Sequence, residues 1–228
     1  MDPRDQALLA TCPVVAVPRF SPLPAMANGQ RVLVARNGWF LQTRLDWLDH
    51  IVALGSAVPA ACLPYGEVVE HLRLAFGTLP VAQIEEFLAE ARQSLPDESA
   101  AVLVYARSTG RLRLALCPPL QRSPLRIDYQ RPALAADETV AVDLHTHGTG
   151  PAFWSAADDR DDQGICIAGV FGRLDQARPT ACFRLVLNGW HLPLAGHPWL
   201  SEPPTTPGAT GQSPRAFAWK WRQPWPQA

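Results

Sequence analysis

Residues 140–158 read VAVDLHTHGTGPAFWSAAD, with an alternating run of apolar and polar residues ahead of two glycines. Alternation along a strand predicts that Asp143, His145 and His147 share one face. The other face would hold Val140, Val142, Leu144 and Thr146, with Ala141 on the histidine side. A loop with two glycines follows, and Ser155 is expected to open a helix. The stretch therefore predicts a strand, a loop and a helix in close succession.

The two histidines can reach one metal ion, because residues two apart on a strand project the same way. On a helix that starts at Ser155, Asp158 lies three residues on and on the same face as the serine. Its carboxylate can therefore complete a three-ligand site. Zinc accepts two imidazoles and one carboxylate, and the open fourth position lowers the pKa of a bound water toward ~7.

Each part of this pattern also has a simpler interpretation. Ser155 followed by Asp158 fits a helix N-cap with an acid in the first turn. Asp159, Asp161 and Asp162 are interpreted as a solvated, acidic helix start. A pair of histidines on a strand can be incidental, but the order and spacing of the two motifs together favour a metal site.

The segment before this stretch predicts a helix and two strands. Apolar residues recur at helical spacing from Val81 to Ser94, and Pro96 ends the helix. Residues 100–118 predict two strands joined by a turn at 108–110, with Leu112, Leu114 and Leu116 alternating in the second. A connection rich in proline and arginine runs on to Thr139. Beyond the proposed site, residues 165–172 and 181–189 read as two further strands.

The two ends of the chain differ from this central part. Asn37-Gly38 lies between two β-rich runs within 31–45 and predicts a hairpin with these two residues in its turn. Residues 1–80 are interpreted as a small accessory α+β unit, 81–200 as the domain that carries the site, and 201–228 as a tail rich in proline and tryptophan. The tryptophans of the tail fit either a docking peptide or a segment folded back on the domain.

Composition narrows the classes of function. The chain has 228 residues, 47% of them apolar and 18% charged, which is typical of a globular protein. Twenty basic residues against 21 acidic ones leave no large basic field, so strong nucleic-acid binding is not expected. Five cysteines without a C-x-x-C pair argue against a disulfide framework. We expect no membrane span, no signal peptide and a cytoplasmic location.

The order H-T-H-x(7)-S-x-x-D resembles the signature of JAB/MPN (JAMM) metalloproteases. That family also has a glutamate after the first helix of the domain, and Glu98 holds this position, whereas Glu67 and Glu70 precede the helix. Ala101 stands where the family usually has glycine. The resemblance covers about residues 80–192 and implies an α/β (α+β) fold, with a mixed curved sheet flanked by helices and related to cytidine deaminases.

The resemblance implies a function as well as a fold. His145, His147 and Asp158 would hold Zn²⁺, Glu98 would take a proton from water and return it to the leaving amine, and the Ser155 hydroxyl would stabilise the oxyanion. The substrate would be an amide bond, an isopeptide or processing site of a ubiquitin-like protein. Asp143 is expected either to orient an imidazole or to pair with an arginine.

The segments YGE, VPRF and DDRDDQG resemble the protein A family of PRTRC cassettes, which are carried by plasmids and other mobile elements. This finer resemblance implies ThiF-related and other cassette proteins as partners. Two alternatives stay open. One is a JAB-like module that binds a partner without cleaving it. The other is a PHP-type phosphoesterase, whose fold needs several more His and Asp clusters than the residues after His147 offer.

Overall fold

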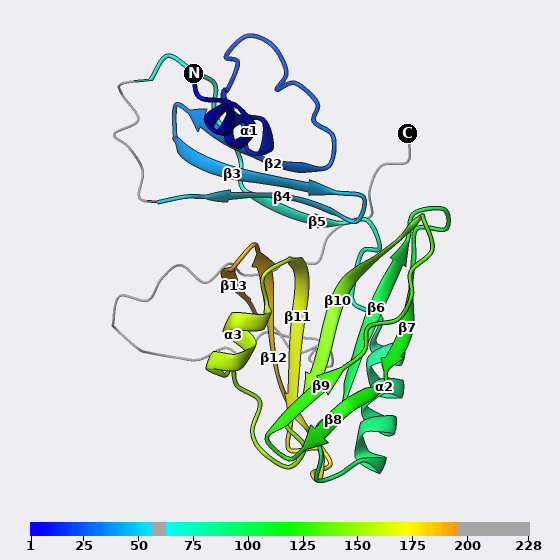
Figure 1. Cartoon of the computed structure of the whole chain (residues 1–228). Coiled ribbons are helices and arrows are strands. Elements are labelled where there is room, and N and C mark those ends of the chain that lie inside the picture. The colour runs from blue at the N-terminus through cyan, green and yellow to red at the C-terminus, as the bar shows by residue number, and fades with distance from the viewer. Residues whose placement is uncertain (56–62, 196–228) are drawn as a thin grey trace, which may run out of the picture. The chain divides into compact units, whose positions relative to one another are not determined.

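The computed structural model describes residues 1–55 and 63–195, and these form two units that divide between Gly77 and Thr78 (Figure 1). Each unit is described by itself. The tail predicted at 201–228 lies outside the described residues. Among the residues described, no helix is both long and apolar enough to cross a membrane.

The unit of residues 1–77 is a five-stranded sheet with one helix. Its strands follow chain order across the sheet, and only the first pair is parallel. They are β1 Val14–Ala16, β2 Gly29–Ala35, β3 Gly38–Leu45, β4 Leu48–Ala53 and β5 His71–Leu74. Helix α1, Pro3–Thr11, begins at Asp2, whose side chain accepts a hydrogen bond from the Arg4 amide. Leu33, Phe40 and Ile51 form the core of one sheet face.

The predicted hairpin is present as β2 and β3, but its turn lies one residue earlier than expected. Ala35 pairs with Gly38, so Arg36 and Asn37 form the turn, and Gly38 begins the next strand at a φ of 142°. The Asn37 side chain accepts a hydrogen bond from the Val68 amide at 2.9 Å and donates one to the Val68 carbonyl at 2.7 Å. The asparagine therefore binds a distant backbone segment, and the prediction that it and Gly38 form the turn is wrong.

The second unit contains a six-stranded mixed sheet in the order β13-β12-β11-β10-β6-β7. The strands are β6 Ala100–Ala106, β7 Arg111–Cys117, β10 Glu138–Thr146, β11 Ile165–Gly172, β12 Thr180–Leu187 and β13 Trp190–Leu194. β10 and β11 are parallel, and the other neighbours are antiparallel. This confirms the predicted mixed α+β fold and its strands, whereas β13 was not predicted.

Helix α2, Val81–Gln93, confirms the helical spacing found in the sequence. Its periodic residues Ile84, Phe87, Leu88 and Ala91 are buried, and the Phe87 ring meets Phe171 of β11 edge-on at 6.2 Å. Each large apolar side chain buried in this way contributes about 1.5–3 kcal/mol. Figure 1 shows α2 behind the sheet, with helix α3, Ala156–Asp161, in front of it.

A two-stranded ribbon occupies part of the connection that the sequence left without structure. β8, Pro119–Ser123, pairs with β9, Arg126–Tyr129. Ile127 and Tyr129 pack on a cluster that includes Val102 and Val104 of β6, on the face opposite α2. The ribbon escaped prediction because its first strand, PLQRS, has almost no apolar alternation.

A β-bulge in β10 changes which face one predicted residue occupies. Val140 pairs with Val104, and Val142 pairs with the adjacent Leu103, so Ala141 is the extra residue. Val140 therefore packs with the cluster of Val102 and Val104, on the histidine face. Its predicted place with Val142 and Leu144 is wrong. The alternation from Val142 to His145 is undisturbed.

Candidate metal centre

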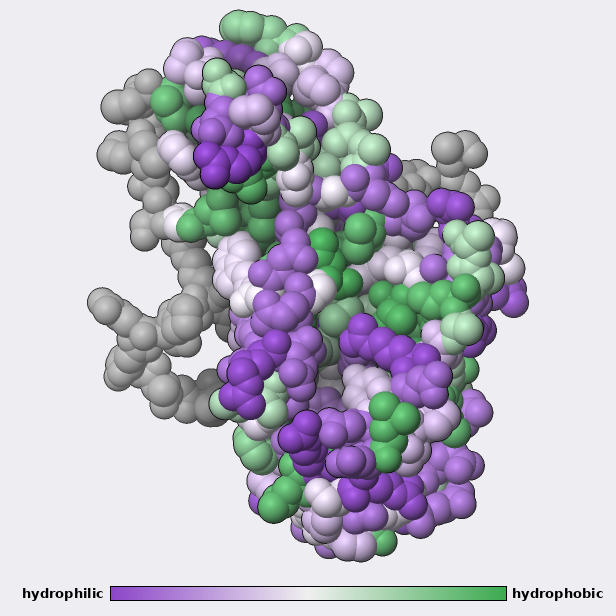
Figure 2. Space-filling view, in the orientation of Figure 1, coloured by the Kyte–Doolittle hydropathy of each residue, from purple (hydrophilic) through white to green (hydrophobic). Residues whose placement is uncertain are grey.

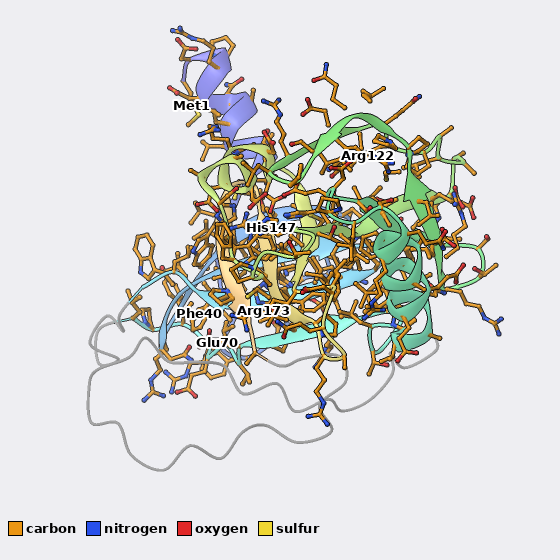
Figure 3. The ribbon with its side chains drawn as sticks, turned by 90° about the horizontal axis from the view of Figure 1, so that it is seen from below. Met1, Phe40, Glu70, Arg122, His147 and Arg173 are labelled. Carbon is orange, nitrogen blue, oxygen red and sulfur yellow. The ribbon has the colours of Figure 1, made fainter. Side chains whose placement is uncertain are left out.

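His145 and His147 lie at the end of β10, in the centre of the sheet. His145 pairs with Ala100 of β6 on one side and with Val170 of β11 on the other. The backbone amide of His147 donates to the Phe171 carbonyl at 2.7 Å. The two Nε2 atoms are 3.3 Å apart, so the histidines converge as the sequence predicts. His147 is labelled in Figure 3.

Asp158 of α3 completes a group of three metal-binding side chains. Its Oδ1 lies 3.3 Å from His145 Nε2, and one ligand atom from each of the three residues lies within 4.8 Å of the others. Ligand atoms ~2.0–2.1 Å from a tetrahedral zinc ion are about 3.3 Å apart. Two of the three spacings match this value. The donor types and these two spacings are therefore compatible with a zinc ion.

The backbone contact of His147 and the burial of His145 also suit a metal site. His147 Nδ1 lies 3.2 Å from the Pro151 carbonyl oxygen, so a proton on Nδ1 can be donated to it and Nε2 keeps its lone pair. Burial lowers the pKa of His145 to about 4, although the Asp158 charge opposes this shift. The His145 ring is therefore expected to be neutral, as a metal ligand must be.

Asp158 caps its helix as well as facing the histidines. The Ser155 Oγ accepts a hydrogen bond from the Asp158 amide at 3.2 Å, and Asp158 Oδ2 accepts one from the Ser155 amide at 2.6 Å. This reciprocal pair is a capping box. The cap uses Oδ2, and Oδ1 faces His145. Asp158 can therefore cap the helix and serve as a metal ligand at the same time.

Glu98 follows α2 at the start of β6, where the sequence placed it. It is 7% exposed, and its pKa is raised to about 7, first by burial and second by the negative charge of Asp158. Its backbone amide donates to the Ser123 carbonyl at the tip of the ribbon, at 3.1 Å. Ala101 is fully buried and pairs regularly with Leu144, so alanine in place of glycine leaves the strand undistorted.

Thr146 is a site residue that sequence reasoning missed. It lies between the histidines and is fully buried. Its Oγ1 accepts a hydrogen bond from the Ser99 amide, and its own amide donates to the Ser99 carbonyl, both at 2.9 Å. These bonds fix the residue after Glu98 to the residue between the two histidines. The sequence offered no signal for this beyond the position of Thr146.

The other acidic residues considered from the sequence have separate partners. Asp143 accepts hydrogen bonds from the Tyr129 hydroxyl at 2.9 Å and from Arg131 at 2.6 Å, which confirms the arginine pairing. Glu67 lies 3.5 Å from Arg36, and Glu70 accepts a hydrogen bond from the backbone of β4. Both glutamates belong to the unit of residues 1–77 and not to the one with the histidines.

The acidic start of α3 is not simply solvated, and the prediction is wrong for two of its residues. Arg184 of β12 is 3% exposed and binds Asp159 at 2.5 Å and Asp162 at 2.7 Å. Its guanidinium carbon lies 3.9 Å from the centre of the Trp154 ring. The Trp154 ring in turn meets the His145 ring at 6.2 Å. A buried cation therefore links β12 to the helix that carries Asp158.

Two family models match separate parts of the chain. Residues 80–186 match the family described as prokaryotic homologs of the JAB domain. Residues 2–75 match a domain of unknown function, DUF2016. The solution structure of protein DSY2949 from Desulfitobacterium hafniense is 21% identical, with a TM-score of 0.36, and the match covers 49% of this chain and 85% of that one. A comparison with curated proteins found none similar to the chain.

Proposed function

We propose that this protein is a zinc-dependent metallopeptidase or isopeptidase that hydrolyses an amide bond. The observation that carries the proposal is the convergence of His145, His147 and Asp158, in which His145 Nε2 lies 3.3 Å from a ligand atom of each of the other two residues. The match of residues 80–186 to prokaryotic JAB homologs supports a JAB-like module at this site. Bound zinc would polarise the scissile carbonyl and activate a water molecule for attack on it.

The side chains of the protein would handle the proton and the developing charge. A carboxyl group with a pKa near 7 can accept a proton and return it at neutral pH, so Glu98 serves as base and then as acid. The Ser155 oxygen accepts a bond from the Asp158 amide, and its hydroxyl proton can be donated to an oxyanion. Capping therefore does not conflict with the proposed role of Ser155.

The proposed substrate is a ubiquitin-like protein joined through a diglycine-like terminus, as the resemblance to JAMM metalloproteases implies. The segments that resemble the protein A family of PRTRC cassettes extend the proposal to ThiF-related proteins as partners. The PHP-type alternative is not favoured. Within residues 1–55 and 63–195, His145, His147 and Asp158 are the one group of three or more residues placed to hold a metal.

Two substitutions separate metal binding from turnover. Asp158→Ala removes a ligand, and we expect the purified protein to lose its zinc. Glu98→Gln keeps all three ligands, so zinc should remain while turnover falls by about 10²–10⁴-fold. Zinc is measured by elemental analysis, and turnover by release of a fluorogenic amine from the C-terminus of ubiquitin.

Glu67→Gln provides the matched control, because this exposed glutamate lies in the other unit. It should change neither zinc content nor turnover. If Glu98→Gln hydrolyses the probe as fast as the unsubstituted protein, Glu98 is not the base. A protein that holds zinc and binds ubiquitin without cleaving it would support the binding-module alternative instead.

A further inference from the structure

Helix α3 carries the third proposed ligand but has no apolar anchor of its own. It has six residues, AADDRD, and none of them is buried. Figure 2 shows a hydrophilic surface over this helix. A helix of less than two turns is marginal in water by itself. The capping box orders the first turn internally, but it does not attach the helix to the sheet.

Arg184 supplies that attachment. Its three guanidinium nitrogens donate to one carboxylate in the helix and one at its C-cap: Nη1 to Asp159 at 2.5 Å, and Nε and Nη2 to Asp162 at 3.1 and 2.7 Å. These two residues follow Asp158 by one and four positions, so they hold the turn that begins at the proposed ligand. Arg184 is 3% exposed and the Asp162 side chain is 16% exposed, so solvent screens this pair little, whereas the Asp159 carboxylate is half-exposed.

The Arg184 guanidinium also contacts Trp154, which lies beside the histidine ligand His145. It stacks on Trp154, which immediately precedes the capping serine and meets the His145 ring edge-on. His191 of β13 adds a weaker contact, with Nδ1 3.6 Å from Asp159 Oδ1. One side chain of β12 thus contacts the segments before and after Asp158 and, through Trp154, the ring of a histidine ligand.

We propose that Arg184 is a positioning residue that holds Asp158 and His145 in the arrangement a metal ion requires. The inference rests on the proposed metal centre. Arg184 does not bind the metal or the substrate, and it acts by fixing the helix and Trp154. Outer partners that orient metal ligands typically change metal affinity by ~10–100-fold when they are substituted.

The test uses Arg184→Met in the full-length chain, with Arg113→Met as the matched control. Arg113 also binds a carboxylate through two nitrogens, at 2.7 and 2.8 Å from Glu138, but it lies on β7, and Glu138 is at the opposite end of β10 from His145. Competition with a chelator measures zinc affinity, and the visible spectrum of the Co²⁺ form reports ligand geometry. We expect Arg184→Met to weaken zinc binding ~10–100-fold and alter the spectrum, and Arg113→Met to change neither.

A metal-free measurement keeps the inference separate from the proposed function. Hydrogen exchange of the 156–162 amides in chelated protein should accelerate in Arg184→Met and stay unchanged in Arg113→Met. If the unsubstituted protein binds no zinc, the proposed function fails, whatever Arg184 does. If zinc binds equally to Arg184→Met and to the unsubstituted protein, the positioning role alone is wrong.

Two milder variants serve if Arg184→Met does not fold. Arg184→Lys keeps one charge but cannot span both carboxylates, so it should recover part of the lost zinc affinity. Asp159→Asn removes the charge of the half-exposed carboxylate that Arg184 binds, without leaving a cavity. We expect this variant to lose less zinc affinity than Arg184→Met. Unchanged affinity and spectrum in both would overturn the proposal.

Discussion

Single residues in this protein combine structural and chemical roles, and Asp158 shows how. One carboxylate oxygen closes the capping box, and the other faces His145 at 3.3 Å. From the sequence alone, helix capping and metal binding are alternative explanations of Asp158, because a motif gives the spacing of residues and not the direction of each carboxylate oxygen. The coordinates show that both interactions come from one side chain.

The buried side chain of His50 should make the stability of the folded protein depend on pH. It lies in β4, is 6% exposed, and its Nδ1 is buried without a hydrogen-bond partner. Its pKa is lowered from 6.5 to about 4, first by burial and then by the charge of His71, against the opposing effect of Asp49. Between pH 6.5 and 4, His50 is therefore protonated in the unfolded chain and neutral in the folded chain. Stability is full above pH 6.5 and falls by about 3 kcal/mol as pH drops to 4.

His50→Leu removes the titrating imidazole, so the stability of the variant should fall less as the pH drops from 6.5 to 4. The measurement is hydrogen exchange of the β4 amides in full-length protein at pH values between 7.5 and 4.5, corrected for the intrinsic rate. The unsubstituted protein should lose protection faster than His50→Leu as pH falls. Parallel losses in the two proteins would mean that His50 does not govern the acid response.

At the scale of elements, the loop between β10 and α3 depends on a glycine of β11. A Cβ on Gly172 would meet backbone atoms of the loop, at 2.3 Å from Gly150 O and 2.4 Å from Ala152 N. The same loop supplies the Pro151 carbonyl that faces His147 Nδ1. Gly172→Ala should therefore displace the loop, weaken zinc binding and destabilise the unit by about 1–3 kcal/mol.

Gly164→Ala is the natural control, since it lies at the other end of β11 and a Cβ there meets no atom within 4 Å. Thermal unfolding measures the stability of the two variants, and zinc titration measures their metal affinity. Both should be lower in Gly172→Ala than in Gly164→Ala. Equal behaviour of Gly164→Ala and Gly172→Ala would show that the loop tolerates the added methyl group and that its position does not set zinc affinity.

The elements with strong periodicity were predictable, and those defined by distant contacts were not. α2 has four buried residues at helical spacing, so the sequence locates it closely. The bulge at Ala141 and the turn at Asn37 depend on pairing with Val104 and on hydrogen bonds to Val68, respectively. Local patterns carry no information on such partners. The same reason hid the role of Arg184, whose carboxylate partners lie 22 and 25 residues away.

At the scale of the whole molecule, metal should stabilise one unit and not the other. Zinc that binds only the folded state adds about 4 kcal/mol at a free concentration a thousandfold above Kd. The proposed ligands all lie in the unit that begins at Thr78. Removing zinc with a chelator should therefore speed hydrogen exchange in β10 and β11 and leave β2 and β3 unchanged.

Asp158→Ala supplies the control for this prediction, because a protein without the third ligand should not respond to the chelator. A chelator effect of equal size in β2 and β3 would show that metal stabilises the whole chain. No effect in β10 would mean that zinc binds too weakly to stabilise the folded domain.

The burial of Glu98 has a consequence for how this domain can evolve. Burying an ionisable carboxyl group costs folding free energy, so replacing Glu98 with a neutral residue is expected to raise the free energy of unfolding of the domain. Asp158, in contrast, also closes its helix cap, so its loss would cost stability. In a related protein that does not hydrolyse amide bonds, we therefore expect Glu98 to be replaced before Asp158.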